Sequence, residues 1–233
     1  MLNSTIVIKV KQRLNKLDSQ DYDNLETWQI LEAFNKGQVE WCRRQIVGTN
    51  LLKQGDEQSR RRVDDLQVLL TPAPLVLAKK PLYYEAPVPA NYFQYKKINT
   101  TATTKDCTAG KPIIIYQGEE VNVPILLRDD NKKPSFEWGE TFSTLVNNTF
   151  RIYTNDDFTL KSADVLYYRQ PTYIQIVGVS DAYTNLISSV EVPCEFKDDV
   201  VELLIDECSK IIAGDIESMI QVQRNAQSVE QNN

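Results

Sequence analysis

The spacing of apolar residues changes twice along this chain, and the change limits the folds that the sequence can adopt. Near both ends, apolar residues recur every three or four positions, which is typical of amphipathic helices. Between the ends the period shortens to two, and prolines become dense at Pro72, Pro74, Pro81, Pro87 and Pro89. Prolines at this density exclude helices and favour edge strands and turns. The sequence therefore predicts an α+β fold with helices at its ends and strands in the middle.

Two helices are predicted in the N-terminal region. The first runs from about Ser4 to Leu14, although its β-branched residues also fit a short strand. The second starts with a capping-box pattern at Asp23 and ends at Gly48, a residue type that often terminates helices. Gly37 lies inside the second helix, where it indicates a bend or a close contact with another helix.

The middle of the chain is rich in β-branched and aromatic residues and predicts a series of short strands. Residues 121–127 fit either a strand or a single helical turn. We expect residues 150–153 and 165–169 to pair as a hairpin across the turn signal at residues 154–157. One further strand is predicted to start at Leu66, and others are predicted over residues 92–104, 111–116, 136–145 and 173–179.

A long final helix is predicted from about Lys197 to Gln223, after Pro193. Beyond Gln221 the composition becomes rich in Gln, Asn and Ser, which predicts a flexible tail or a segment that orders on a partner. Because neither helical end buries its apolar stripe alone, we expect the two ends to pack together as a helical base. The predicted divisions are residues 1–65 and 193–223 for the base, 66–192 for a projecting β-rich domain of sandwich or barrel type, and 224–233 for the tail.

The residue types argue against catalysis. The chain holds no histidine, which excludes Ser-His-Asp triads, Cys-His pairs and histidine metal sites. The Asp pairs at 129–130 and 156–157 fit turns better than calcium loops. The four cysteines lack zinc-finger or disulfide spacing, so we predict reduced, mostly buried thiols and folding in the cytosol: Cys42, Cys107, Cys194 and Cys208. We expect a protein that is not an enzyme and holds no cofactor or metal.

Charge and hydropathy limit the partners. The net charge of −6 argues against sequence-reading nucleic-acid binding, which usually needs a basic face. No stretch approaches the ~20 apolar residues of a membrane span, so no membrane partner is expected.

Three groups of side chains are candidates for contacts. Tyrosines of the middle region fit cross-strand packing or, alternatively, sugar stacking. Candidates for the core or for a subunit interface are Trp28, Phe34, Trp41, Ile205 and Ile212. Arginine clusters fit solvated surface, or contacts with DNA or an acidic partner, at Arg43, Arg44, Arg60, Arg61 and Arg62.

Several stretches that cover most of the chain in order carry a family resemblance. They include residues 17–35, residues 39–45 (VEWCRRQ), residues 134–142 (PSFEWGETF), residues 150–158 (FRIYTNDDF) and residues 167–171, together with the terminal helix from Phe196. As a set, they resemble a virion ring protein of the head-to-tail connector of crAss-like tailed bacteriophages.

The resemblance implies a structural role. Such adaptors form a ring, commonly of twelve copies, beneath the portal protein, where they continue the DNA channel and dock neighbouring tail ring proteins. It implies a helical base with a β-rich projection. It also implies that double-stranded DNA passes through the channel without sequence recognition, and that the protein lies in the virion neck after assembly in the bacterial cytoplasm. It also implies that the C-terminal segment grips the portal, with Gln221, Gln223, Arg224 and Asn225 as candidates. Another tail-layer ring, a non-catalytic tail-side binding module and a carboxylate hydrolase stay open as alternatives.

Overall fold

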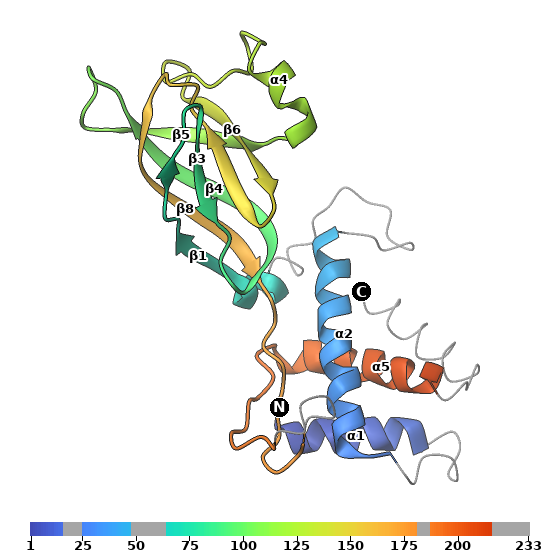
Figure 1. Cartoon of the computed structure of the whole chain (residues 1–233). Helices are drawn as coiled ribbons and strands as arrows, with labels where there is room; N and C mark the ends of the chain where they lie inside the picture. Colours follow the sequence, from blue (N-terminus) through green and yellow to red (C-terminus); the bar gives the residue numbers. More distant parts are fainter. Residues whose placement is uncertain (16–24, 48–63, 181–186, 216–233) are drawn as a thin grey trace. The chain divides into compact units, whose positions relative to one another are not determined.

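The computed structural model describes residues 1–15, 25–47, 64–180 and 187–215. The chain divides into two compact units, one made of Met1–Val68 with Pro171–Asn233 and the other of Leu69–Gln170. We call them the helical unit and the β-rich unit (Figure 1). The predicted α+β class, with a β-rich insertion between helical segments, is confirmed.

The described part of the helical unit contains three long helices: α1 (Asn3–Asn15), α2 (Thr27–Val47) and α5 (Asp198–Asp215). Helix α2 crosses α5 (Figure 1), and their apolar stripes bury Phe34 of α2 and Leu204 of α5 completely. Gly37 of α2 lies at this crossing, where a Cβ would be in van der Waals contact, 3.5 Å from Cγ of Glu207 on α5. The expected close helix contact at this glycine is therefore confirmed.

Helix α1 packs on α5 mainly through apolar burial. Ile6, Val10 and Leu14 recur on one side of α1 and are fully buried, so the short-strand alternative for this segment is wrong. Lys9 and Arg13 pair with Glu202 of α5 at the rim of this contact. These pairs are partly exposed and contribute about 1 kcal/mol or less each, whereas each buried aliphatic side chain contributes about 1.5–3 kcal/mol.

Residues 171–192 belong to the helical unit, although the sequence placed them in a β-rich domain that ended at residue 192. Side chains of the helices satisfy their backbone groups. Asn3 donates to the carbonyls of Gln175 and Val192 at 3.0 and 2.8 Å, and the side chain of Asn35 accepts from the amide of Ile174 at 2.9 Å. The strand predicted at residues 173–179 is wrong, because within the described part of this segment only isolated bridges form.

The β-rich unit holds one curled sheet of eight strands in the order β1-β8-β4-β5-β6-β7-β3-β2. The β5–β6 pair is parallel and the other neighbouring pairs are antiparallel. The strand predicted from Leu66 starts only at Leu70, because residues 64–69 are helical. The strands are β1 (Leu70–Pro74), β2 (Ala78–Lys79), β3 (Tyr83–Pro87), β4 (Tyr92–Thr103), β5 (Lys111–Gln117), β6 (Glu140–Val146), β7 (Thr149–Tyr153) and β8 (Thr159–Arg169).

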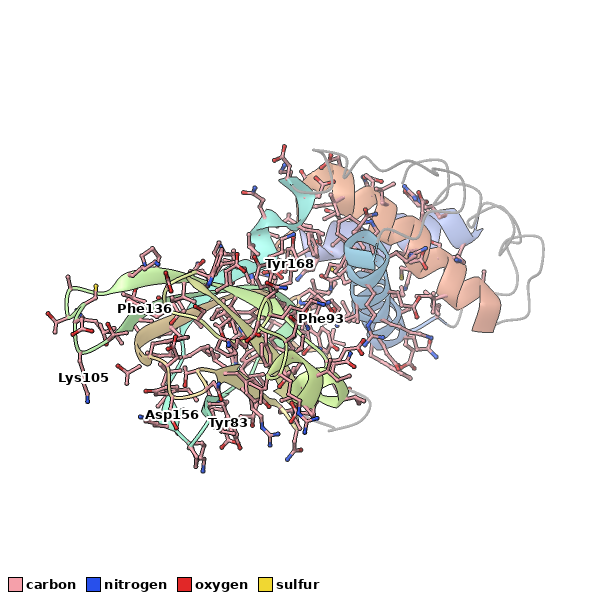
Figure 2. The ribbon with its side chains drawn as sticks, turned by 90° about the horizontal axis from the view of Figure 1, so that it is seen from above. Tyr83, Phe93, Lys105, Phe136, Asp156 and Tyr168 are labelled. Atoms are coloured by element: carbon pink, nitrogen blue, oxygen red, sulfur yellow. The ribbon has the colours of Figure 1, made fainter. Side chains whose placement is uncertain are left out.

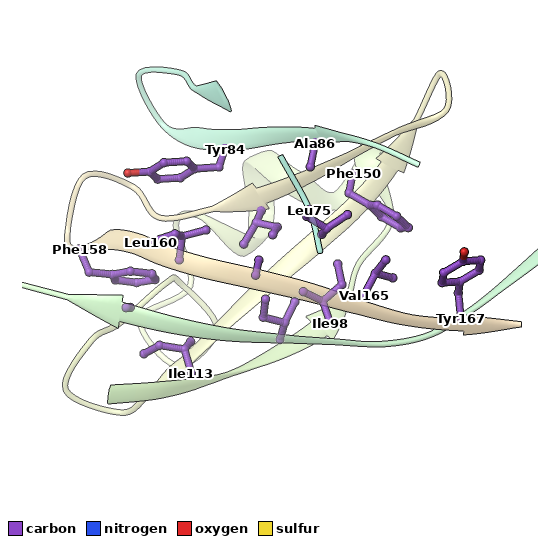
Figure 3. Packing of buried hydrophobic residues seen from close by; sticks show 14 residues of the cluster. Leu75, Tyr84, Ala86, Ile98, Ile113, Phe150, Phe158, Leu160, Val165 and Tyr167 are labelled. Atoms are coloured by element: carbon purple, nitrogen blue, oxygen red, sulfur yellow. The ribbon is translucent and has the colours of Figure 1, made fainter. Parts of the chain in front are cut away.

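The concave side of the sheet encloses one apolar core, which explains the alternating pattern of the strands. Ile98 of β4 pairs with Val165 of β8, and both side chains are fully buried (Figure 3). Tyr167 is buried in the same core, and Tyr92 stacks on it with ring centroids 5.9 Å apart. The cross-strand packing predicted for the tyrosines is confirmed at these positions, and the buried Tyr167 has no open face for a sugar.

The predicted hairpin between residues 150–153 and 165–169 is wrong. Strand β7 pairs with β6 and β3, while β8 pairs with β4 and β1, so the turn at 154–157 joins strands that are not neighbours. The hairpin of this region is β6–β7, whose turn residues Asn147 and Asn148 have φ angles of 48° and 56°. Two adjacent residues with positive φ match the twist of flanking antiparallel strands, and asparagine tolerates that conformation well.

The parallel β5–β6 pair requires a crossover connection, since a tight turn cannot reverse the chain twice. Residues 118–139 provide it and contain the short helices η2 (Glu120–Asn122) and α4 (Val123–Leu126). Of the two alternatives for residues 121–127, the helical one is confirmed. The strand predicted at 136–145 begins only at Glu140, because residues 136–139 form a turn.

Candidate functional site

The turn before β6 places a large aromatic side chain in solvent. Trp138 is 80 % exposed, although Ser135 and Glu140 exchange two backbone hydrogen bonds of 2.9 and 3.2 Å around it. The amide of Gly139 also donates to the carbonyl of Ser135, and the φ of Gly139 is +71°, a value that glycine adopts easily. The backbone that carries Trp138 is thus closely hydrogen-bonded while the indole itself is uncovered.

Side chains from other elements clamp the same turn. Lys111 of β5 donates to the carbonyls of Phe136 and Glu137 at 3.0 and 2.9 Å. The amide of Phe136 donates to the carboxylate of Asp157 at 2.7 Å, and its ring packs against Phe158 with centroids 6.3 Å apart. The turn is therefore held from both β5 and the start of β8. An exposed tryptophan on a fixed backbone loses less conformational freedom on binding than one on a flexible loop, which suits an interface anchor.

Two further apolar side chains lie on the convex face of the sheet near this turn. Ile114 and Tyr116 of β5 are 53 % and 52 % exposed, and Ile114 pairs directly with Glu140 of β6. The hydroxyl of Tyr116 donates to Glu140 at 3.0 Å, and this hydrogen bond raises the pKa of Tyr116. We call Ile114, Tyr116 and Trp138, with the exposed Glu137 beside them, the Trp138 face.

The turn that carries Trp138 lies towards the end of the β-rich unit that is remote from its chain connections. Phe136 and Tyr168 lie at opposite ends of the unit in Figure 2. Strand β8 runs between them, because Phe158 precedes its first residue and Tyr168 pairs with Leu70, where the unit begins. A strand of this length spans roughly 35 Å, so the exposed indole is far from residues 69 and 170.

The first half of the β5–β6 connection is anchored separately. Glu120 accepts hydrogen bonds from Thr144 and Arg151, each at 2.6 Å, and Arg151 also lies 3.5 Å from the carboxylate of Glu85. Burial, and then the charge of Glu120, raise the pKa of the neighbouring Tyr153. Every charged member of this cluster has an opposite charge or a hydrogen bond, so the cluster fixes the connection on the sheet and does not form an open acid–base site.

A second candidate site is a groove in the helical unit, of about 920 Å³, which we call the α2 groove. One wall is a face of α2 that includes Trp28, Leu31 and Val39. The other wall is made by residues 173–176, 179–180 and 187–190, where Ile187 and Val190 are largely exposed. Charged residues alternate along the rim of α2, namely Glu32, Lys36, Glu40 and Arg43. The groove is concave and largely apolar, as ligand and peptide sites usually are.

The structure places the five apolar candidates in different environments. Phe34, Trp41, Ile205 and Ile212 are buried and belong to the core of the helical unit. Trp41 meets Phe196 edge to face with centroids 5.4 Å apart. Trp28 alone among the five is half-exposed, and it lines the α2 groove.

The arginine candidates divide in the same way. Arg43 is exposed at the rim of the α2 groove. Arg44 is not a free surface cation, because its guanidinium lies 2.8 Å from the carboxylate of Glu207, which is 2 % exposed. The remaining arginine candidates and the C-terminal portal-contact candidates lie outside the described residues: Arg60, Arg61, Arg62, Gln221, Gln223, Arg224 and Asn225.

Sequence reasoning did not select the Trp138 face. It assigned residues 136–145 to a strand, in which successive side chains point alternately to the core and to the surface, so Trp138 was not singled out as exposed. The available signal was the position of a tryptophan between Pro134 and Gly139, two residue types that favour a turn over a strand.

Two comparisons with known proteins found no match. No protein-family model matches the sequence, and no curated protein matches it. In the described ranges, no group of three or more Cys, Asp or Glu side chains is arranged to hold a metal ion. None of the helices in those ranges is long and apolar enough to cross a membrane.

Proposed function

We propose that this chain is a virion structural protein that forms a ring in the head-to-tail connector of a tailed bacteriophage. In this role, it lies below the portal protein, continues the DNA channel and docks the tail. The chain acts as a building block and not as an enzyme. It is assembled in the cytoplasm of the infected bacterium and ends in the neck of the virion.

The observation that carries this proposal is the Trp138 face. A tryptophan that is 80 % exposed on a clamped turn is suited to a permanent protein partner. The segment that builds this turn, residues 134–142, is also one of the stretches that resemble the connector ring proteins. The exposed anchor and the family resemblance thus meet in the same nine residues.

The charge of the chain agrees with a channel role. With a net charge of −6, a ring of twelve copies would carry a large negative charge, which repels DNA phosphate and lets the genome slide without sticking. Contacts with DNA are therefore expected to be independent of base sequence.

The test is to purify the chain, alone and with the portal protein of its phage, and to measure mass by multi-angle light scattering and shape by electron microscopy. We expect a closed ring, commonly of twelve copies, that forms alone or on the portal. A chain that stays monomeric at all concentrations and ignores the portal would refute the proposal. A ring that binds another tail ring instead of the portal would move the chain to a different layer of the tail.

Deleting residues 222–233 tests the portal contact separately. We expect the deletion variant to keep its fold, measured by circular dichroism, and to bind the portal more weakly. Unchanged portal binding would remove the C-terminal candidates from the interface.

A further inference from the structure

Among the described residues, two apolar surfaces are uncovered, and they differ in shape. The Trp138 face projects from the β-rich unit, and the α2 groove is hollowed into the helical unit. From their exposed fractions, the three apolar side chains of the Trp138 face present on the order of 400 Å² to solvent. A patch of this size on a monomer is usually functional, and the groove adds a second one.

We propose that the Trp138 face of one copy docks into the α2 groove of the next copy. This inference rests on the proposed ring and names the contact that builds it. Because the two surfaces are different, each copy inserts its Trp138 face, the knob, into one neighbour and receives the Trp138 face of the other neighbour in its α2 groove. Such a head-to-tail contact produces a closed ring when the rotation between successive copies closes.

The chemistry of the two surfaces is complementary. The groove, at about 920 Å³, has room for an indole together with the neighbouring side chains of Ile114 and Tyr116. A covered indole N–H requires an acceptor, and the carboxylate of Glu40 stands on the groove wall. The exposed Glu137 next to Trp138 has a possible counter-charge in the exposed Lys36 at the groove rim. One partner therefore satisfies the apolar, hydrogen-bonding and charged groups at the same time.

The position of Trp138 suits contact between copies. The turn lies at the end of the β-rich unit remote from residues 69 and 170, where the chain enters and leaves that unit. The hydrogen-bonded backbone of the turn is ordered before the neighbour arrives, which lowers the conformational cost of binding.

Cross-linking between two variants that each carry one introduced cysteine tests the contact. Glu137→Cys keeps Trp138 in place and marks the knob, and Lys36→Cys marks the groove, both in a Cys107→Ser background that removes the least buried native thiol. The two proteins are mixed, allowed to assemble and treated with a short bis-maleimide. We expect a covalent dimer that contains one chain of each kind, and no dimer when either variant is treated alone. Val76→Cys, which is exposed outside the Trp138 face, replaces Glu137→Cys as the matched control and should give no dimer.

The outcomes separate this contact from the ring itself. Assembly without the mixed cross-link refutes the knob-and-groove contact and leaves the proposed function standing. Dimers of Glu137→Cys with itself show a two-fold contact and also refute it. A chain that carries both cysteines and links only within itself overturns the inference, because the knob then fills its own groove. Absence of any assembly, alone or with the portal, refutes both proposals.

A second measurement uses Trp138→Ala. Because the indole is outside the core, we expect an unchanged thermal midpoint but at least a tenfold higher concentration for half-assembly, as for other central aromatic anchors. Val121→Ala is the matched control, since Val121 is even more exposed and lies outside the Trp138 face. Equal assembly of the two variants would contradict the proposal.

Discussion

The contact between Arg44 and Glu207 gives the sharpest stability prediction. Glu207 of α5 is 2 % exposed, and its two carboxylate oxygens lie 2.8 Å from Arg44 and 3.8 Å from Lys210. We expect Arg44→Met to destabilise the helical unit, because methionine fits the helix but leaves the buried charge with only the more distant lysine. Removing one partner of a buried pair costs about 3–5 kcal/mol, but Arg44 is partly exposed and Lys210 stays in place, so we expect about 2 kcal/mol.

The assay is urea unfolding followed by far-UV circular dichroism, which reports mainly the helical unit, since the long helices α1, α2 and α5 lie there. Arg43→Met, on the same helix but exposed, is the control and should change the free energy of unfolding by about 0.5 kcal/mol or less. The double variant Arg44→Met/Glu207→Leu removes the isolated charge and should recover most of the lost stability. If Arg44→Met behaved like Arg43→Met, or if the double variant were less stable than Arg44→Met, the reasoning would be refuted.

Three further predictions concern glycine conformation and thiols. Gly110→Ala should destabilise the β-rich unit by about 2–4 kcal/mol, since φ is +93° and the new Cβ would lie 2.7 Å from Cγ2 of Thr101. Gly178→Ala, where φ is also positive but no atom lies within 4 Å, should cost only about 1 kcal/mol. Equal losses in thermal unfolding would contradict the steric argument. Gly37→Ala should stabilise α2 by about 0.5–1 kcal/mol, because its Cβ fits at ordinary contact distances, and a clear loss in urea unfolding would show a tighter crossing. Burial raises the pKa of Cys42 from an ordinary 9.0 to about 12, so a thiol reagent at neutral pH should label Cys107 well before Cys42. The stability that the neutral Cys42 thiol contributes should be complete below pH 9 and should decrease as the pH rises toward 12. Cys42→Ala should reduce this loss of stability at alkaline pH.

Much of the helical unit could be predicted because helical periodicity is a local property of the sequence. The buried stripe of α1, from Ile6 to Leu14, and the close approach at Gly37 both follow from spacing along a single helix. The segment 171–192 shows where this reasoning ends. Its apolar residues resemble a strand, yet its backbone partners are Asn3 and Asn35, which lie far away in the sequence and carry no local signal.

Strand pairing in the β-rich unit was less predictable than strand location. The turn at residues 154–157 is a strong local signal, but a turn signal does not show whether the two strands that it connects pair with each other. Here β7 pairs with β6 and β8 pairs with β4. Asn155 and Asp156 of this turn have positive φ, as do Asn147 and Asn148 of the β6–β7 hairpin, so the local conformation alone does not decide which strands become neighbours.

The candidate site was the least predictable part. Exposure of Trp138 depends on contacts that Lys111 and Asp157 make with its turn, and these residues come from different strands and loops. Sequence spacing alone does not bring them together. Four of the five core or interface candidates are buried and Trp28 is half-exposed, whereas Trp138 was not among the candidates.

The ends of the sheet have a consequence for the behaviour of many copies at high concentration. An outer strand with free backbone groups invites other chains to extend the sheet, and this leads to fibres. Here β1 carries Pro72 and Pro74 at one border, and β2 at the other border is only two residues long. Proline has no amide hydrogen to donate, so copies that gather while a particle is being built are steered away from amyloid-like stacking and toward contacts made by side chains.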